Sequence, residues 1–423
     1  MSQLEVLGPI HPKRGELIFN RQQDGVLELE WLGFRYSLSN QGRPFTENEE
    51  RLLKGIGNVL STRYQILFNA DLAARNFHLF SGLPEDRYVS AFLDPSHIRR
   101  ETLTRSTDRI EDAIEVLRIS SLTTYENRRI ETGVLLFGSQ PDPCHSLPQL
   151  PPGTLRYSSA LTSIRAFHRL CDALQTMALV DRDGLLVEIV DIQEWTQPFG
   201  NFKLSVPSTA RYDPHSRATM CGGHICLILT PNGEIKIFAD GMQVFNFLGG
   251  RWRLTDPLEK YSVWEKAVGN KQMAERLFSV ALNLAEDRRG GMFVILNDAQ
   301  IANRMIAYSD LLSSQSISSD TSKFGSKDQL HYLLRQKSVL NLSPTVLETL
   351  ARIDGAIVLD RESNLLAFGA ILRHPLGIDE RIHAVEGGRT TAAIFASRFG
   401  NVLKVSEDGF ISFFQDGQDI WEM

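Results

Sequence analysis

The chain has 423 residues, of which 23% are charged and 42% are hydrophobic, and its formal net charge is −6 at pH 7. This length accommodates about two or three domains, and the composition is typical of a soluble globular protein with a sizeable core. The slight negative charge gives no electrostatic reason to expect a nucleic acid or an anionic membrane as a partner.

The sequence also indicates a cytoplasmic location. No apolar run approaches the roughly twenty residues needed to span a bilayer. The first residues lack the continuous apolar core of a signal peptide. Four cysteines in a chain of this length do not form a disulfide framework, so a reducing compartment is expected.

Residues 1–140 are expected to form an N-terminal region with a strand-rich start followed by helices. The first forty-odd residues alternate short apolar runs with glycine turns, which predicts strands. From Thr46 onwards apolar residues recur at helical spacing, and Thr46 before Glu49 resembles a capping box. A second helix is predicted within residues 108–133.

A proline-rich segment, residues 141–153, is predicted to be an interdomain linker, because it has several prolines and no periodicity. Residues 154–262 then form a predicted middle α/β domain. In it, residues 161–180 are expected to be helical, residues 183–192 to form a strand, and residues 223–247 to form a β-meander with Asn-Gly and Asp-Gly turns.

The last predicted domain comprises residues 263–423. A long amphipathic helix over residues 262–290 precedes a buried strand, Met292–Leu296. The chain then continues as helix, two strands, helix and two strands, with a Ser-rich loop at 310–326. The whole pattern predicts an α/β class built on mixed sheets flanked by helices.

One segment of the middle domain resembles a segment of the last domain in sequence. LILTPNGEIKIFADGMQVF aligns without gaps on LKVSEDGFISFFQDGQDIW. The matches include Gly233 with Gly409 and Phe238 with Phe414. One interpretation is a duplicated α/β unit whose first copy has diverged. The alternative is two unrelated hairpins, since Asn-Gly and Asp-Gly turns recur for steric reasons alone.

The stretch Gly387-Gly388-Arg389-Thr390-Thr391 is a candidate anion site. Its glycines allow a close backbone approach to a ligand, and Thr390 or Thr391 is suited to cap the following helix. Gly400 fits the position just after the end of that helix. The N–H groups of a helix start favour a phosphate, although Arg389 could instead point to solvent or pair with Glu386.

Two further motifs flank this stretch. Asp354-Gly355-Ala356 opens an apolar strand and leaves a carboxylate beside open space, although an Asx-type turn explains it equally well. Ser406-Glu407-Asp408 ends a strand before Gly409. Its carboxylates suit Mg²⁺ or Mn²⁺, and the alternative is a solvated hairpin turn.

Taken in order, DGAIVLDRESNLLAFGAIL, EGGRTTAA and VLKVSEDGFISFFQDG resemble the nucleotide-binding DAC domain of the DisA-type diadenylate cyclases. LAEDRRGGMFVIL resembles the helix-to-strand entry of the same domain, so the resemblance covers roughly residues 264–423. The preceding residues look like the sensor regions found N-terminal to DAC domains in bacterial signalling proteins.

The resemblance implies a nucleotidyltransferase that joins two ATP molecules into cyclic di-AMP at a homodimer or higher homo-oligomer, assisted by Mg²⁺ or Mn²⁺. It implies that Asp354 and Glu407 are metal ligands and that, with Arg389, they are the catalytic residues. The implied nucleotide- and phosphate-binding residues are Gly355, Ala356, Gly387, Gly388, Arg389, Thr390, Thr391 and Ser406.

The family pattern has a His and a second Arg where this chain has Thr390 and Thr391, and a Thr where it has Gly388. Because a lost guanidinium removes a bidentate phosphate clamp, a second function stays open. That alternative is a catalytically inactive receptor for a nucleotide or a cyclic dinucleotide.

A group of zinc-ligand residue types also occurs in HSRATMCGGHIC, which contains His215, Cys221, His224 and Cys226. The spacing matches none of the usual zinc patterns, and Cys226 lies in an apolar strand where free cysteines are usually core residues. A metal is the less favoured interpretation here.

Overall fold

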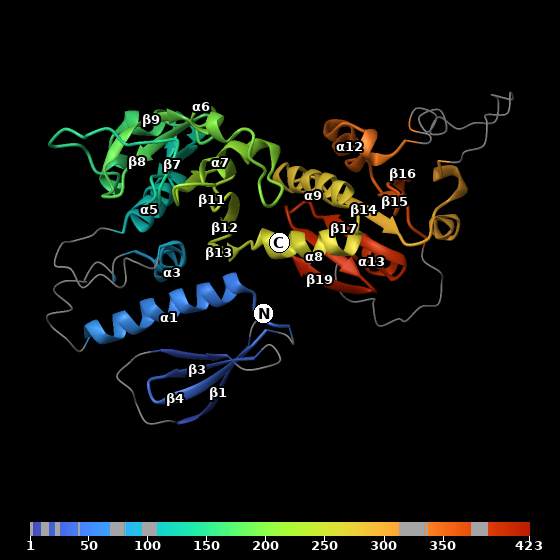
Figure 1. Cartoon of the computed structure of the whole chain (residues 1–423), viewed down its shortest axis with the longest axis horizontal. Coiled ribbons are helices and arrows are strands. Elements are labelled where there is room, and N and C mark those ends of the chain that lie inside the picture. Colours follow the sequence, from blue (N-terminus) through green and yellow to red (C-terminus); the bar gives the residue numbers. More distant parts are fainter. Residues whose placement is uncertain are drawn as a thin grey trace. The chain divides into compact units, whose positions relative to one another are not determined.

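The computed structural model describes residues 3–9, 17–21, 26–40, 43–67, 80, 82–94, 108–312, 334, 337–373 and 388–423. The chain forms two compact units (Figure 1). Unit 1 comprises Met1–Leu204 with Pro214–Asp256, and unit 2 comprises Ser205–Asp213 with Pro257–Met423. Helices and mixed sheets occur in both units, which confirms the predicted α/β class.

Unit 1 begins with the predicted strands, which form a four-stranded antiparallel sheet in the order β1-β4-β3-β2. These strands are β1 (Gln3–Pro9), β2 (Ile18–Arg21), β3 (Val26–Trp31) and β4 (Phe34–Ser39). Helix α1 (Glu47–Leu67) follows with the predicted capping box. The Glu49 N–H donates to Thr46 Oγ1 at 3.2 Å, and the Thr46 N–H donates to Glu49 Oε2 at 3.0 Å.

The main sheet of unit 1 has seven strands in the order β13-β12-β11-β10-β7-β8-β9. The strands are β7 (Thr132–Leu136), β8 (Thr176–Val180), β9 (Leu186–Asp191), β10 (Ile225–Leu229), β11 (Ile235–Ala239), β12 (Met242–Leu248) and β13 (Arg251–Leu254). Because β7 and β8 are neighbours in this sheet, residues 141–153 connect two strands of one sheet. The segment expected to be an interdomain linker therefore lies within a unit, and the division between units follows Asp256.

Besides α1, the described part of unit 1 contains α3 (Pro84–Leu93), α5 (Arg109–Ser121), α6 (Ile192–Thr196) and α7 (Asp213–Ala218), whose first residue is assigned to unit 2. A two-stranded ribbon, β5 (Thr124–Tyr125) and β6 (Arg128–Arg129), follows α5. Apolar side chains of α3 and α5 pack on one face of the main sheet.

The helix predicted over residues 161–180 is wrong. Two short 3₁₀ turns, Ser159–Ser163 and Arg165–Arg169, are separated by Ile164 in an extended conformation, and β8 follows. The apolar run at the end of the segment is buried beside β7, so tertiary pairing overrides the local helical pattern.

Unit 2 contains a six-stranded sheet in the order β16-β15-β14-β17-β18-β19. The strands are β14 (Gly291–Leu296), β15 (Ala356–Asp360), β16 (Leu365–Ala370), β17 (Gly400–Val405), β18 (Ile411–Gln415) and β19 (Gln418–Glu422). The long helix predicted before β14 is two helices, α8 (Pro257–Val268) and α9 (Lys271–Glu286). Gly269, with φ of +74°, separates them, and Asn270 Oδ1 caps α9 by accepting from the Met273 N–H.

The sheet of unit 2 is covered on both faces (Figure 1). Alternate strand residues pack against α8, α9 and α12 (Pro344–Ala351) on one side and against α10 (Ala302–Met305) and α13 (Gly388–Ala396) on the other. Phe293 and Ile295 contribute to the first layer, and Val294 and Leu296 to the second. This alternation is the two-residue period of a strand buried on both faces.

The two main sheets share one arrangement of strands. The order β9-β8-β7-β10-β11-β12 in unit 1 matches β16-β15-β14-β17-β18-β19 in unit 2, with one parallel pair, β7–β8 or β14–β15, in each. The pair Cys226–Phe238 corresponds to Val402–Phe414, and both of the following ladders are irregular at that Phe. The likeness therefore extends from the turns to whole sheets, which favours the duplicated-unit interpretation.

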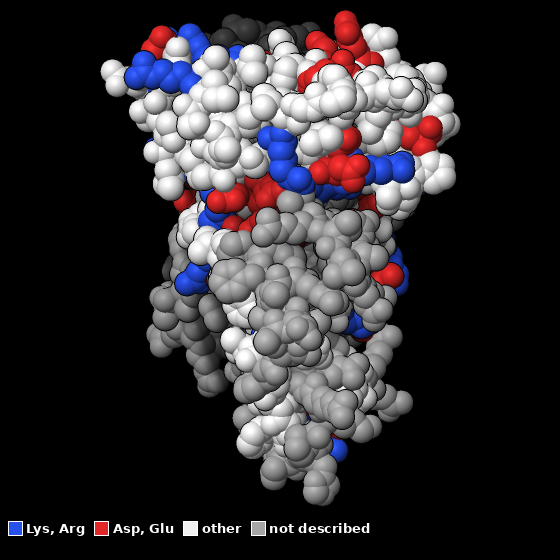
Figure 2. Space-filling model, turned by 90° about the vertical axis from the view of Figure 1, so that its left-hand side faces the viewer, with Lys and Arg blue, Asp and Glu red and all other residues white. Residues whose placement is uncertain are grey.

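Within the described residues, no helix combines the length and the apolarity needed to cross a membrane. The face shown in Figure 2 carries interspersed acidic and basic side chains on its described part.

Candidate functional site

The Asp354-Gly355-Ala356 motif lies between α12 and β15. Asp354 is exposed, with 83% of its side chain accessible, whereas Ala356 is buried as the first residue of β15. Gly355 has φ of +109°, and a Cβ on it would lie 2.6 Å from the backbone carbon of Gly369 in β16. Glycine is therefore required here because β15 and β16 approach closely, and Asp354 stands just outside that contact.

Arg389 brings the three predicted catalytic residues together. From the first turn of α13, its Nη2 donates to Asp354 Oδ1 at 3.2 Å and its Nη1 donates to Glu407 Oε1 at 3.1 Å. Glu407 follows β17, so the three residues come from three separate segments. Gly290 leaves room for the guanidinium, because a Cβ there would lie 2.4 Å from Arg389 Nη1.

A second positively charged side chain, that of Lys404, lies near Arg389 at the start of α13. Lys404, a largely buried residue of β17, donates from Nζ to Thr390 Oγ1 at 2.9 Å and lies 5.6 Å from the centre of the Phe414 ring. The ammonium group of Lys404 and the guanidinium group of Arg389 therefore both lie at the first turn of α13.

The other predicted phosphate-binding residues have varied positions. Gly388 is the exposed first residue of α13, and Thr390 and Thr391 lie inside its first turn rather than capping it. Ser406 is occupied in the β17–β18 turn, where its Oγ accepts from the Phe410 N–H at 3.1 Å. Gly387 lies outside the described residues.

The expected end of α13 also differs. The helix stops at Ala396, a 3₁₀ turn at Ser397–Phe399 follows, and Gly400 begins β17 in an extended conformation. Gly400 is needed for another reason, since a Cβ there would lie 2.0 Å from the Ile295 carbonyl oxygen on β14.

Asp354 and Glu407 provide suitable donor atoms for the expected metal, but Arg389 already pairs with both carboxylates. Two exposed carboxylates are the hard oxygen ligands that Mg²⁺ prefers. A divalent cation would therefore compete with Arg389 for these carboxylates.

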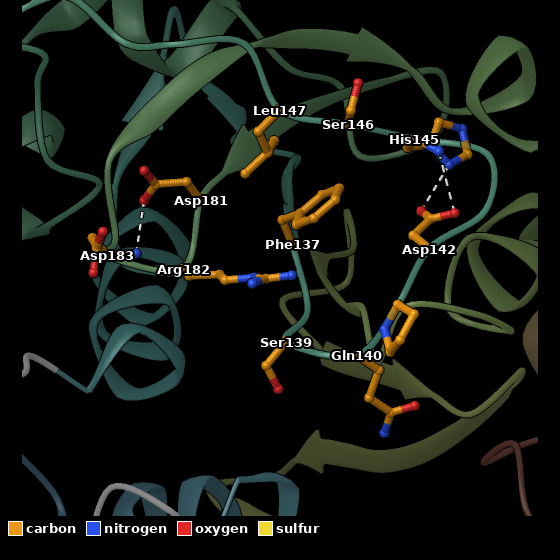
Figure 3. A pocket seen from close by; sticks show the side chains of 11 residues that line it. Phe137, Ser139, Gln140, Asp142, His145, Ser146, Leu147, Asp181, Arg182 and Asp183 are labelled. Carbon is orange, nitrogen blue, oxygen red and sulfur yellow. Dashed lines mark hydrogen bonds and ion pairs between the residues drawn. The ribbon is translucent and has the colours of Figure 1, made fainter.

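Unit 1 contains a cluster of Asp142, His145 and His224 that was not predicted from the sequence, and Figure 3 shows two of its members, Asp142 and His145. His224 Nε2 lies 2.7 Å from Asp142 Oδ2, and His145 Nδ1 lies 3.0 Å from the same oxygen. Asp142 and His145 come from the proline-rich segment, where no structure was expected. Only His224 belonged to the HSRATMCGGHIC group.

Two other members of that group, His215 and Cys226, lie elsewhere, whereas Cys221 lies near Asp142. His215 is fully buried in α7, with its Nε2 2.8 Å from the Ala173 carbonyl oxygen. Cys226 is buried in β10, where burial raises the pKa of its thiol. These two residues are core residues, as the sequence analysis favoured for Cys226.

Comparisons with known proteins add little to this geometry. No family model matches the chain, and no curated protein matches it. A hypothetical membrane spanning protein from Bacillus cereus is 16% identical with a TM-score of 0.27, over 38% of this chain and 69% of that one. DacA from Staphylococcus aureus is 19% identical with a TM-score of 0.23, over 37% of this chain and 87% of that one. At these scores neither likeness carries an argument.

Proposed function

We propose that unit 2 binds a nucleoside triphosphate, ATP foremost, at Asp354, Arg389 and Glu407, and joins two such nucleotides into a cyclic dinucleotide. The N-terminal part of the chain would sense a signal and regulate this reaction. The observation that supports the proposal is the convergence of these three residues, with Arg389 3.1–3.2 Å from both carboxylates.

Phosphate binding follows from the donors gathered at α13. The first N–H groups of a helix have no partners within the helix and favour an anion. Arg389 and Lys404 add positive charge beside them. Both partners of Arg389 are exposed, so exchanging a carboxylate for a more highly charged phosphate costs little free energy.

Once Arg389 has turned to phosphate, Asp354 and Glu407 would be free to hold Mg²⁺ or Mn²⁺. Such an ion would supply neutralisation of phosphate charge and a lower cost of forming a 3′-alkoxide. Arg389 therefore has two proposed roles: it keeps the carboxylates neutralised in the empty protein and clamps phosphate in the complex.

In the proposed reaction, the 3′-oxygen of each nucleotide forms a bond to the α-phosphorus of the other, and the bond to pyrophosphate breaks. The hydroxyl protons pass to solvent, and two pyrophosphates leave. Positioning and charge stabilisation supply most of the rate enhancement in such transfers. Two nucleotides facing each other would require a homodimer or a larger homo-oligomer.

Incubating the purified full chain with ATP and Mn²⁺, and separating the products by chromatography, tests the proposal. We expect a cyclic dinucleotide and two equivalents of pyrophosphate, and neither product from Arg389→Ala. A wild-type chain that forms no cyclic dinucleotide from any mixture of nucleoside triphosphates would refute turnover.

A second function is favoured by Thr390 and Thr391, which lie in the first turn of α13 where the family pattern has a His and a second Arg. Because a hydroxyl does not replace a bidentate guanidinium clamp on a reacting phosphate, the second proposal is that unit 2 is a receptor that binds a nucleotide or cyclic dinucleotide without converting it. Calorimetry with ATP and with cyclic dinucleotides separates the two functions. The receptor predicts binding without product, and a chain that binds neither ligand at millimolar concentration is not a receptor of this kind.

A further inference from the structure

The Asp142–His145–His224 cluster in unit 1 is buried and compact. The side chains of Asp142, His145 and His224 are 1%, 13% and 0% exposed, respectively. Among the described residues, these three form a group whose donor atoms all lie within 4.8 Å of one another. A carboxylate and two imidazoles at such spacing are the ligand types of zinc and of other divalent transition metals.

Hydrogen bonds and ring stacking fix the orientation of Asp142 and His145, as outer contacts commonly do for metal ligands. Asp142 Oδ1 accepts from the Cys144 N–H at 2.8 Å and the His145 N–H at 3.2 Å, which leaves Oδ2 facing the imidazoles. His145 Nε2 lies 3.0 Å from the Trp195 carbonyl oxygen, and its ring stacks on Trp195 at 3.9 Å and 6°. A ligating histidine typically donates its second N–H to such an acceptor.

The cluster borders a cavity of about 560 Å³. Asp142 and His145 line it, together with the polar side chains of Ser139, Gln140 and Arg182 (Figure 3). An ion held by the three side chains would therefore have access to water or to a small ligand on one side. Three protein ligands with an open position distinguish reactive metal sites from closed structural ones.

We propose that Asp142, His145 and His224 bind one divalent transition-metal ion, with Zn²⁺ as the leading candidate, through Oδ2, Nδ1 and Nε2. Ligands about 2.0–2.1 Å from an ion place neighbouring donor atoms roughly 3 Å apart. The two separations of 2.7 and 3.0 Å already approach that value. This site lies in unit 1 and is independent of the nucleotide site proposed in unit 2.

One contact must change when the metal binds. The Gly138 N–H donates to His224 Nδ1 at 2.8 Å, so in the metal-free protein the proton of a neutral His224 is on Nε2 and points to Asp142. Coordination through Nε2 moves this proton to Nδ1 and gives up the bond from Gly138. The buried Gly138 N–H then loses its acceptor and faces a second N–H, a cost that remains smaller than the free energy of coordination by three protein ligands.

The test is metal binding by the full chain, stripped with a chelator and dialysed against micromolar Zn²⁺. We expect one Zn²⁺ per chain, and about 100-fold weaker binding for both Asp142→Asn and His224→Gln. Asp142→Asn keeps a hydrogen-bond acceptor and is the variant expected to fold. Zn²⁺ should raise the melting temperature of the wild type and leave that of Asp142→Asn unchanged.

Two controls isolate the ligand set. His168→Gln alters another buried histidine of unit 1, whose Nε2 lies 2.9 Å from the Thr162 carbonyl oxygen, and should bind as the wild type does. The pair Cys144→Ser and Cys221→Ser removes the neighbouring thiols and should also retain binding. A wild type that takes up no Zn²⁺, binding that persists in both ligand variants, or binding lost with the thiols would each overturn the proposal.

Discussion

Arg389→Ala separates a binding role for this residue from a structural one. Its two ion pairs are exposed, with 40% of the Arg389 side chain and 83% and 73% of its carboxylate partners accessible. Exposed pairs contribute about 0.2–1 kcal/mol each, because water and salt screen them. The free energy of unfolding of unit 2 should therefore fall by no more than about 2 kcal/mol.

The effect on nucleotide binding should be larger. A hydrogen bond between a guanidinium and a phosphate contributes about 1.5–3 kcal/mol. Losing one such bond weakens binding by about 10- to 150-fold at 25 °C. Arg389→Lys keeps the charge but loses the bidentate geometry, so its affinity should lie between those of the wild type and Arg389→Ala.

The assay combines urea unfolding with calorimetric titration of ATP in the presence of Mn²⁺. Arg361→Ala is the matched control, because Arg361 is also an exposed arginine at an end of β15 and donates to Asn297 Oδ1 at 2.9 Å. It should bind ATP as the wild type does. The reasoning is refuted if Arg389→Ala retains wild-type affinity, or if it destabilises unit 2 by more than about 3 kcal/mol.

Three further predictions concern the fold and the site. Gly355→Ala should lower the free energy of unfolding by about 3 kcal/mol or more, because its Cβ would lie 2.6 Å from the backbone carbon of Gly369. Gly269→Ala is the control, since Gly269 has φ of +74° in open space and its replacement should cost only about 1–2 kcal/mol in the same urea titration. Equal losses of stability in the two variants would contradict the steric argument. Lys404→Met should weaken ATP binding, measured by calorimetry, about tenfold. Lys271→Met is the control, because Lys271 is an exposed lysine on α9, and it should leave ATP binding unchanged. Equal ATP affinities for the two variants would exclude Lys404 from the site. Burial raises the pKa of Glu111 to about 8, from 4.5. The folded chain thus holds this proton more tightly, and the resulting stability is complete below about pH 4.5 and lost as the pH rises through 8. Urea unfolding should show the wild type losing about 1–2 kcal/mol more than Glu111→Gln between pH 6 and 8, and parallel profiles would contradict the assignment.

Local sequence signals predicted the elements whose causes are local. The capping box at Thr46 and Glu49 formed as expected, because both hydrogen bonds join residues of one helical turn. The turns at Gly233 and Gly409 also formed, with φ of +79° and +84°. The convergence of Asp354, Arg389 and Glu407 followed a family resemblance rather than any periodicity.

Contacts between residues distant along the chain were not predicted from the sequence. A helix was predicted over residues 161–180, but pairing with β7 makes the end of that segment, Thr176–Val180, a strand. Asp142 and His145 lie in a proline-rich stretch without periodicity, and only folding brings them to His224. No local signal joins residues so distant along the chain.

The shared strand register of the two units has a consequence for kinetics. Gln175 takes the position of Asp354 in unit 1, and Pro231 takes that of Glu407. Neither carboxylate of the proposed nucleotide site is thus duplicated, so each chain contributes a single set of the three proposed residues. If the reaction requires two nucleotides on two chains, turnover per chain should rise with protein concentration. An excess of Arg389→Ala chains should then inhibit wild-type chains by forming mixed dimers with them.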